Sequence, residues 1–148
     1  MGRISHVTGA LAAATLLAGC GGGVLSAEEL SERAASICAD AEMEFAEIQA
    51  VAPRNAREAD EQLLDLNKAA EHEIDTLSGL EPPDELREAY TTYLVSLRRV
   101  ADQIRAARLA AIRDDEVGFD TELRLNRQTR AKRGRLAKKA GLEGCSGS

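Results

Sequence analysis

Aromatic residues are scarce in this chain: its 148 residues include two Tyr, two Phe and no Trp. Proteins that bind sugar rings or single-stranded nucleic acid stack them on several aromatic side chains. The composition therefore argues against both kinds of binding, and we expect no nucleic-acid partner.

Residues that interrupt helices are also few. The chain has only three prolines, and β-branched residues are sparse beside Ala, Leu, Glu and Arg, which are strong helix formers. A hydrophobic fraction of 44% suits a globular core, and the length suits one domain. The composition predicts an all-α fold.

Long hydrophobic runs are absent except near the start of the chain. There, Arg3 precedes an uncharged run over residues 7–18. This run is too short to span a bilayer and has the length of the apolar region of a signal peptide. It ends in the sequence Leu17-Ala18-Gly19-Cys20, in which small residues precede a cysteine.

This pattern resembles the lipobox of bacterial lipoproteins. The resemblance implies that the Cys20 thiol receives a diacylglycerol, that the chain is cut before Cys20, and that the new amino group is acylated, palmitate being one such acyl group. Two or more acyl chains anchor a protein stably to a membrane. We therefore expect a lipid-anchored protein on a bacterial cell membrane, facing outside the cytoplasm. The alternatives are an uncleaved anchor and an ordinary cleaved signal peptide with a chance cysteine.

The expected organisation follows from this start. Residues 1–19 form the signal peptide, and residues 20–25 hold the lipidated cysteine and a Gly-rich tether. Residues 26–142 form the helical domain, and residues 143–148 form a loose C-terminal tail that contains Cys145.

The chain has only three cysteines. If Cys20 carries lipid, Cys38 and Cys145 remain in an oxidising compartment, and two cysteines make one disulfide. An up-down bundle of four helices brings its last end beside its first, which favours this pairing. The alternative is two unpaired thiols.

Apolar residues recur at spacings of three and four in four segments, a pattern typical of amphipathic helices. Ser26 and Glu29 form a capping-box pattern for the first helix, and Asn55 can cap the second. Pro82-Pro83-Asp84 opens the third. The fourth, over roughly 120–140, has a poorer stripe and a Schellman-type stop at Gly141. Short loops between long helices favour an antiparallel up-down four-helix bundle.

The charges are unevenly distributed: residues 27–88 carry a net charge of −13, and residues 89–148 carry +6. We expect acidic and basic helices to neighbour each other in the bundle. Alternatively, the bases of the last helix form a patch for anionic lipid or a wall polymer. These bases are Arg124, Arg127, Arg130, Lys132, Arg133, Arg135, Lys138 and Lys139.

Motifs for catalysis or cofactor binding are missing. His72 is the only histidine after the signal segment, and its neighbours Glu71 and Glu73 point in other directions on a helix. No serine lies in a nucleophile turn, and no glycine loop is placed to cradle phosphate. We expect no metal, no cofactor and no enzymatic activity.

Tyr90 and Tyr93 lie three residues apart on the apolar stripe of the third helix. We expect core tyrosines whose hydroxyls emerge at the rim of the bundle. The alternative is a ligand pocket in which these hydroxyls meet the nearby arginines 98, 105 and 108. The sequence thus favours a non-enzymatic interaction or structural module, with another envelope protein as one candidate partner. The alternative function is an extracytoplasmic binding protein for a small ligand or an anionic polymer.

Overall fold

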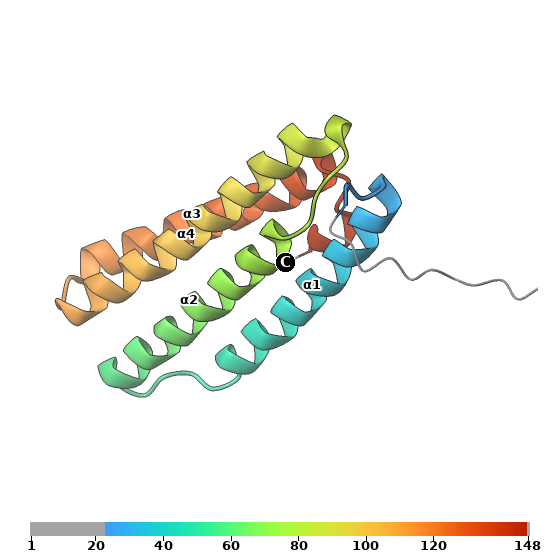
Figure 1. Ribbon diagram of the computed structural model, residues 1–148. Helices are drawn as coiled ribbons and strands as arrows, with labels where there is room; N and C mark the ends of the chain where they lie inside the picture. Colours follow the sequence, from blue (N-terminus) through green and yellow to red (C-terminus); the bar gives the residue numbers. More distant parts are fainter. Residues whose placement is uncertain (1–22, 148) are drawn as a thin grey trace, which may run out of the picture.

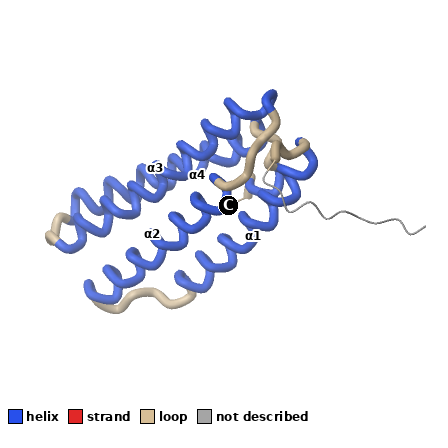
Figure 2. Tube along the Cα trace, viewed as in Figure 1, coloured by secondary structure: helices blue, strands red, loops and turns tan. Residues whose placement is uncertain are grey.

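The computed structural model describes residues 23–147, which form four α-helices and two short 3₁₀ helices and no strand (Figure 2). The helices run up and down in chain order (Figure 1). The predicted all-α, up-down four-helix bundle is confirmed. The elements are α1 (Ala27–Gln49), α2 (Ala56–Ser78), η1 (Asp84–Leu86), α3 (Arg87–Ile112), α4 (Glu116–Lys139) and η2 (Glu143–Cys145). The predicted signal peptide and Cys20 lie outside the described residues.

The predicted capping box starts α1. The backbone N–H of Glu29 donates to Ser26 Oγ over 3.2 Å, and the Ser26 N–H donates to the Glu29 carboxylate over 2.9 Å. These two bonds satisfy amides that have no partner within the helix.

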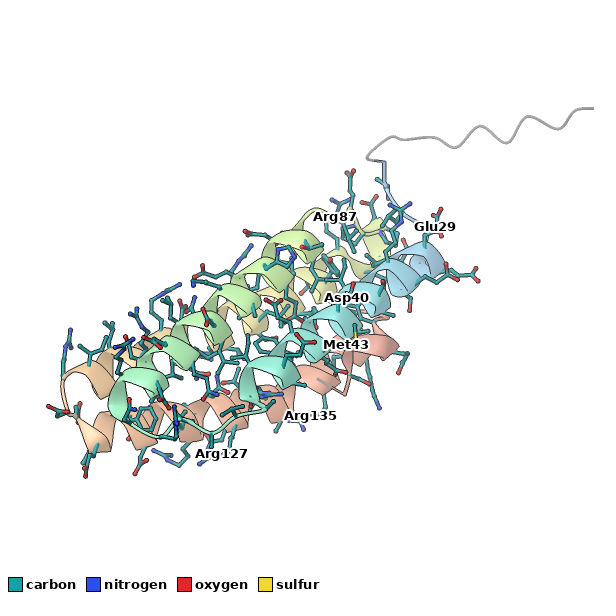
Figure 3. The ribbon with its side chains drawn as sticks, turned by 90° about the horizontal axis from the view of Figure 1, so that it is seen from below. Glu29, Asp40, Met43, Arg87, Arg127 and Arg135 are labelled. Atoms are coloured by element: carbon teal, nitrogen blue, oxygen red, sulfur yellow. A yellow bond between two sulfur atoms is a disulfide. The ribbon has the colours of Figure 1, made fainter. Side chains whose placement is uncertain are left out.

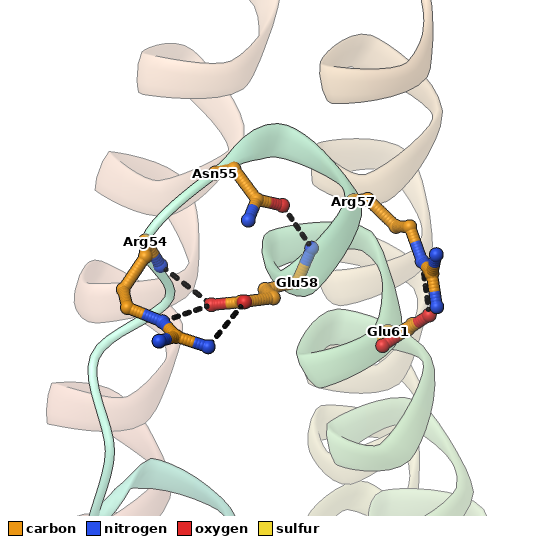
Figure 4. A network of polar contacts seen from close by, with 5 residues as sticks. All are labelled: Arg54, Asn55, Arg57, Glu58 and Glu61. Carbon is orange, nitrogen blue, oxygen red and sulfur yellow. Dashed lines mark hydrogen bonds and ion pairs between the residues drawn. The ribbon is translucent and has the colours of Figure 1, made fainter.

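Asn55 caps α2 as predicted, because its Oδ1 accepts from the N–H of Glu58 over 3.0 Å (Figure 4). The Glu58 carboxylate turns to Arg54 instead of closing a capping box, and it accepts from the Arg54 backbone N–H over 2.9 Å and from its guanidinium over 2.8 Å. One turn later, Arg57 pairs with Glu61 at 2.9 Å. Local polar contacts thus hold this end of the bundle.

Helix α4 starts earlier than the expected residue 120, at Glu116. Asp115 caps it, accepting from the N–H of Gly118 over 2.9 Å, so residues 116–119 are already helical. The far end follows the prediction: Gly141 has φ 73°, Leu142 N–H donates to Ala137 O over 2.9 Å, and Gly141 N–H donates to Lys138 O over 3.1 Å. This pair of bonds is the Schellman motif.

Two segments expected to be loose are packed. Leu25, placed in the tether, is buried, and its N–H donates to Glu81 O over 2.8 Å. The tail forms η2, which packs against α1 so closely that a Cβ on Gly144 would lie 2.5 Å from Cβ of Ala35. Leu142 and Cys145 are fully buried. These segments cover the apolar end of the bundle, which a flexible tether and tail would leave exposed.

The helices pack unequally around the bundle. Helix α2 packs on α1 and α3, and α3 packs along α4, whereas α1 reaches the α4 side of the bundle mainly through η2 (Figure 1). The largest fully buried side chains share one apolar cluster with Cys145 of η2: Tyr93, Leu30, Leu77, Leu97 and Leu142. Away from η2, the space between α1 and α4 is left for a cavity.

Candidate functional site

A cavity of about 470 Å³ lies between α1 and α4, and all four helices line it. Its volume falls within the range of small-molecule sites, which are mostly apolar with a few polar groups. Six apolar side chains form its walls: Phe45, Leu63, Leu66, Val100, Ile104 and Leu123. The charged and amide side chains that line it are Glu42, Gln49, Gln103, Asn126, Arg130 and Arg133.

Arg133 is the most unusual of these polar residues, because its side chain is only 3% exposed. Its Nε is buried and has no hydrogen-bond partner among the described residues. A buried charge without partners is costly, since desolvation is not repaid by hydrogen bonds. The Nε–H therefore needs a hydrogen-bond acceptor that the described part of the chain does not provide.

A second residue of the cavity, Gln103, shares this property. Gln103 is 9% exposed, and its buried Oε1 accepts no hydrogen bond from the described residues. Arg130 and Glu42 are exposed and take part in none of the ion pairs that residues 23–147 form. One buried donor atom, Arg133 Nε, and one buried acceptor atom, Gln103 Oε1, thus lack partners in the lining of the same cavity, an arrangement that suits a bound molecule.

Behind Arg133 lies Glu73, which is buried on α2. Its Oε1 is 3.9 Å from Sγ of Cys38, and the Tyr93 hydroxyl is 3.7 Å from the same sulfur. Burial raises the pKa of Glu73, although the positive charges of Arg133 and Arg130 offset part of this effect. Glu73 therefore favours its neutral form more than an exposed glutamate does.

The two tyrosines are core residues, as expected, but their hydroxyls do not emerge at the rim of the bundle. The Tyr90 hydroxyl donates to Leu77 O over 2.6 Å in the interior, and burial raises its pKa to about 12. Burial also raises the pKa of Tyr93, and the charge of Glu73 adds to the shift. Neither tyrosine lines the cavity.

The arginines considered as partners for these hydroxyls bind elsewhere. Arg105 pairs with Glu71 at 2.6 Å, and Arg108 pairs with Asp60 at 2.6 Å. Arg98 reaches Ser78 Oγ over 3.5 Å. The pocket that the sequence suggested, made by tyrosines and these arginines, is therefore not formed. The observed pocket uses arginines of α4 instead.

Cys38 and Cys145 form a disulfide with a Cα–Cα distance of 5.4 Å, which confirms the predicted pairing. The bond joins α1 to η2, and both cysteines are buried. It therefore fixes the chain end between α1 and α4 and closes one side of the cavity, where Gly147 contributes to the lining.

The predicted basic patch needs one correction. Arg133 does not belong to it, because the side chain faces the core with Ala137 and Ala140, which lie on the same face of α4. Arg130 lines the cavity. Six bases remain on the exposed side of α4, Arg127 and Arg135 among them (Figure 3). The six are Arg124, Arg127, Lys132, Arg135, Lys138 and Lys139.

The sequence held a signal for the cavity that the initial interpretation missed. The apolar stripe of α4 runs through Leu123 and resumes at Leu136, and the helical spacing between them falls on Asn126, Arg130 and Arg133. Polar residues in register with a core stripe indicate a polar site inside the bundle.

His72 is exposed on α2, as expected. In residues 23–147, no group of three or more His, Cys, Asp or Glu side chains is arranged to hold a metal ion. No helix in the same part of the chain is both long enough and apolar enough to cross a membrane.

Comparison of the chain with models of protein families, with curated proteins and with solved structures finds no match.

Proposed function

We propose that this protein is a lipid-anchored, non-enzymatic binding protein that holds a small molecule in the cavity between α1 and α4. The observation that carries this proposal is a cavity lined by two buried polar residues, Arg133 and Gln103, whose Nε and Oε1 atoms lack hydrogen-bond partners among the described residues. A purely structural bundle gains nothing from such groups, because a filled apolar core is more stable.

The chemistry of the lining supports binding rather than catalysis. Nucleophilic catalysis needs a hydroxyl, thiol or amine beside an oriented base. Among the described residues, the cavity is lined by amide, carboxylate, guanidinium and apolar side chains, and by no serine, threonine, cysteine or histidine. We therefore favour the binding protein over both an enzyme and a structural module.

Binding is tested with Nile red, an uncharged dye that fluoresces in apolar sites. The full chain is compared with Ala46→Trp, which places a bulky ring in the cavity lining. The matched control is Ala39→Trp, an exposed position two turns earlier on α1 and outside the lining. We expect saturable fluorescence from the wild type and the control, and a large loss in Ala46→Trp. Equal signals from all three proteins would refute binding in this cavity.

The lipid anchor rests on the lipobox resemblance at Cys20. We expect the protein expressed in bacteria to partition into the detergent phase, and a Cys20→Ser variant to remain an uncleaved or mislocalised precursor, because only the thiol can accept the diacylglycerol. A wild-type protein that stays in the aqueous phase would refute the anchor.

A second candidate function is contact between α4 and an anionic membrane surface. The six exposed bases form no ion pair with the described residues, and no acidic residue occurs from 123 to 142. Each base near an anionic surface contributes about 1 kcal/mol of attraction.

This contact is tested by flotation with vesicles of phosphatidylglycerol or phosphatidylcholine. We expect more binding to phosphatidylglycerol than to phosphatidylcholine, a loss of this preference in added salt, and a loss of it in the double variant Arg127→Glu/Arg135→Glu. The control Arg57→Glu changes charge by the same amount per site on α2, and we expect it to bind more strongly than the double variant. A preference for phosphatidylglycerol that does not change with salt, or equal binding to both kinds of vesicle, would refute the electrostatic contact.

A further inference from the structure

The polar end of the cavity carries an excess of positive charge. Arg130 and Arg133 lie three residues apart on the same side of α4, so both guanidinium groups face the cavity. Burial lowers the pKa of Arg130, and the like charge of Arg133 lowers it further. Neither arginine has a carboxylate within ion-pair distance among the described residues.

Two carboxylates are near these arginines, but only one lines the cavity. Glu42 lies on α1 in the lining, whereas Glu73 is buried behind Arg133. The charged side chains that line the cavity are therefore two arginines and one glutamate. This set has a net charge of one positive unit, which a ligand with one negative charge would balance.

The rest of the cavity is apolar. Phe45, Leu66, Ile104 and Leu123 come from all four helices and present hydrocarbon surface. Burial of a hydrocarbon chain against such walls is favourable, because it removes apolar surface from water. A small hydrophilic anion would leave this surface wet, so the cavity suits a molecule with an apolar body.

We propose that the ligand is an amphipathic monocarboxylate, whose carboxylate binds Arg130 and Arg133 and whose hydrocarbon part lies against Phe45, Leu66 and Ile104. The proposal rests on the proposed function, since it names the ligand class of the same cavity. A planar guanidinium matches a carboxylate in two parallel hydrogen bonds. A phosphate monoester is a poorer match, because it carries about 1.5 to 2 negative charges at neutral pH.

The test uses four ligands with the same hydrocarbon chain: dodecanoate, dodecanol, dodecylammonium and dodecyl phosphate. Their affinities for the full chain are measured by displacement of Nile red below the micelle concentration. A hydrogen bond to a charged group contributes about 1.5–3 kcal/mol, so we expect dodecanoate to bind about tenfold to hundredfold more tightly than dodecanol.

Variants assign the preference to the arginines. Arg133→Met keeps a long side chain and removes the charge, and Arg135→Met makes the same change on the exposed side of α4. We expect Arg133→Met to reduce the affinity for dodecanoate about tenfold or more and to change that for dodecanol little. Arg135→Met should bind both ligands like the wild type. Circular dichroism verifies that each variant is folded.

The outcomes separate the two proposals. Equal affinities for dodecanoate and dodecanol would overturn the carboxylate assignment and leave the binding function intact. Tighter binding of dodecylammonium or dodecyl phosphate would also overturn it. Failure of every ligand, with no Nile red signal from the wild type, would overturn both proposals.

If Arg133→Met does not fold, Arg130→Gln is the second variant, because Arg130 lines the cavity at its more exposed edge. We expect it to reduce the affinity for dodecanoate about tenfold and to spare dodecanol. An unchanged ratio of the two affinities in Arg130→Gln would contradict the role of the arginine pair.

Discussion

The two ends of the bundle are built differently. At the end where η2 lies, Leu30, Leu77 and Tyr93 are fully buried, and the disulfide joins α1 to the chain end. At the other end, large apolar residues remain exposed: Val51 by 73%, Ile112 by 54% and Val117 by 79%. The cavity lies between α1 and α4, and along the bundle it lies between η2 and this open end.

This contrast separates stability from binding. Binding sites are generally drawn from the less stable parts of a protein, because buried polar groups and unfilled space cost free energy. Here the crosslinked end supplies dense apolar packing, which allows α1 and α4 to stay apart elsewhere. We therefore expect perturbations of the crosslinked end to cost the most stability, and those of the cavity to cost the least.

The largest effect should come from the disulfide. It closes a loop with a sequence separation of 107 residues, and a loop of about 100 residues is worth about 4.7 kcal/mol in the chain-entropy model. We expect Cys38→Ala/Cys145→Ala to lose several kcal/mol of unfolding free energy and to loosen η2 first. Urea unfolding measures the loss, and hydrogen exchange locates it.

The control is the reducing agent. A thiol reductant should destabilise the wild type to about the level of the double variant and leave the variant itself unchanged. Equal unfolding free energies of wild type and variant would show that the disulfide does not make the crosslinked end the more stable one.

Truncation of matched leucines compares the ends directly. Leu77 is fully buried near the disulfide, whereas Leu123 is half-buried in the lining of the cavity. We expect Leu77→Ala to cost about 2–5 kcal/mol, the usual loss for a filled core. Leu123→Ala should cost about 1 kcal/mol or less, because solvent already reaches the site. Similar losses at both positions would contradict the difference in packing.

The sequence predicted the dense end better than the open one. Ser26, Asn55 and Gly141 predicted their helix boundaries because capping depends on local backbone geometry. Cys38 and Cys145 could be paired because compartment and helix order left few alternatives. The packing of Leu25 and η2 was missed, since small and glycine-rich segments carry no periodic pattern and order only through tertiary contacts.

Charged residues are usually exposed, and a prediction based on this rule gives no indication of the cavity. Arg133 and Glu73 both lie at helical spacing from core residues, yet Arg133 was placed in a surface patch and the burial of Glu73 was not predicted. Local periodicity places them on the inner face, but only the distance between α1 and α4 decides whether that face meets a packed helix or a cavity. That distance depends on η2 and the disulfide, which act across the whole length of the chain.

A smaller effect should appear in the pH dependence of stability. Burial raises the pKa of Glu73 in the folded state above its ordinary value. The stabilisation from neutral Glu73 is therefore present below the ordinary glutamate pKa and is lost as pH rises through the raised value. We expect the stability of the wild type relative to Glu73→Gln to fall as pH rises from about 4 to about 8.

The difference between the two proteins isolates this residue. Glu29, Glu58 and Glu71 have lowered pKa values through their hydrogen bonds, and they produce the opposite trend in both proteins alike. Urea unfolding at a series of pH values gives the comparison. A difference that is flat, or that rises with pH, would contradict the buried position of Glu73.

The smallest effects should come from the ion pairs that join α2 to α3. These two helices pack directly on each other, whereas α1 and α4 are separated by the cavity. Arg108 and Asp60 are 28% and 30% exposed, whereas Arg105 and Glu71 are 51% and 49% exposed. Because exposed pairs are screened and contribute about 0.2–1 kcal/mol, we expect Arg108–Asp60 to lie near the upper end of this range and Arg105–Glu71 near the lower. Double-mutant cycles with alanine measure both couplings.

Added salt should weaken the Arg105–Glu71 coupling more, because water and ions reach that pair more easily. If the more exposed pair had the larger coupling energy, burial would not determine the strength of the ion pairs between α2 and α3. The described residues of α1 and α4 form no ion pair with each other. In that case, only apolar contacts would explain why α2 and α3 pack more closely than α1 and α4.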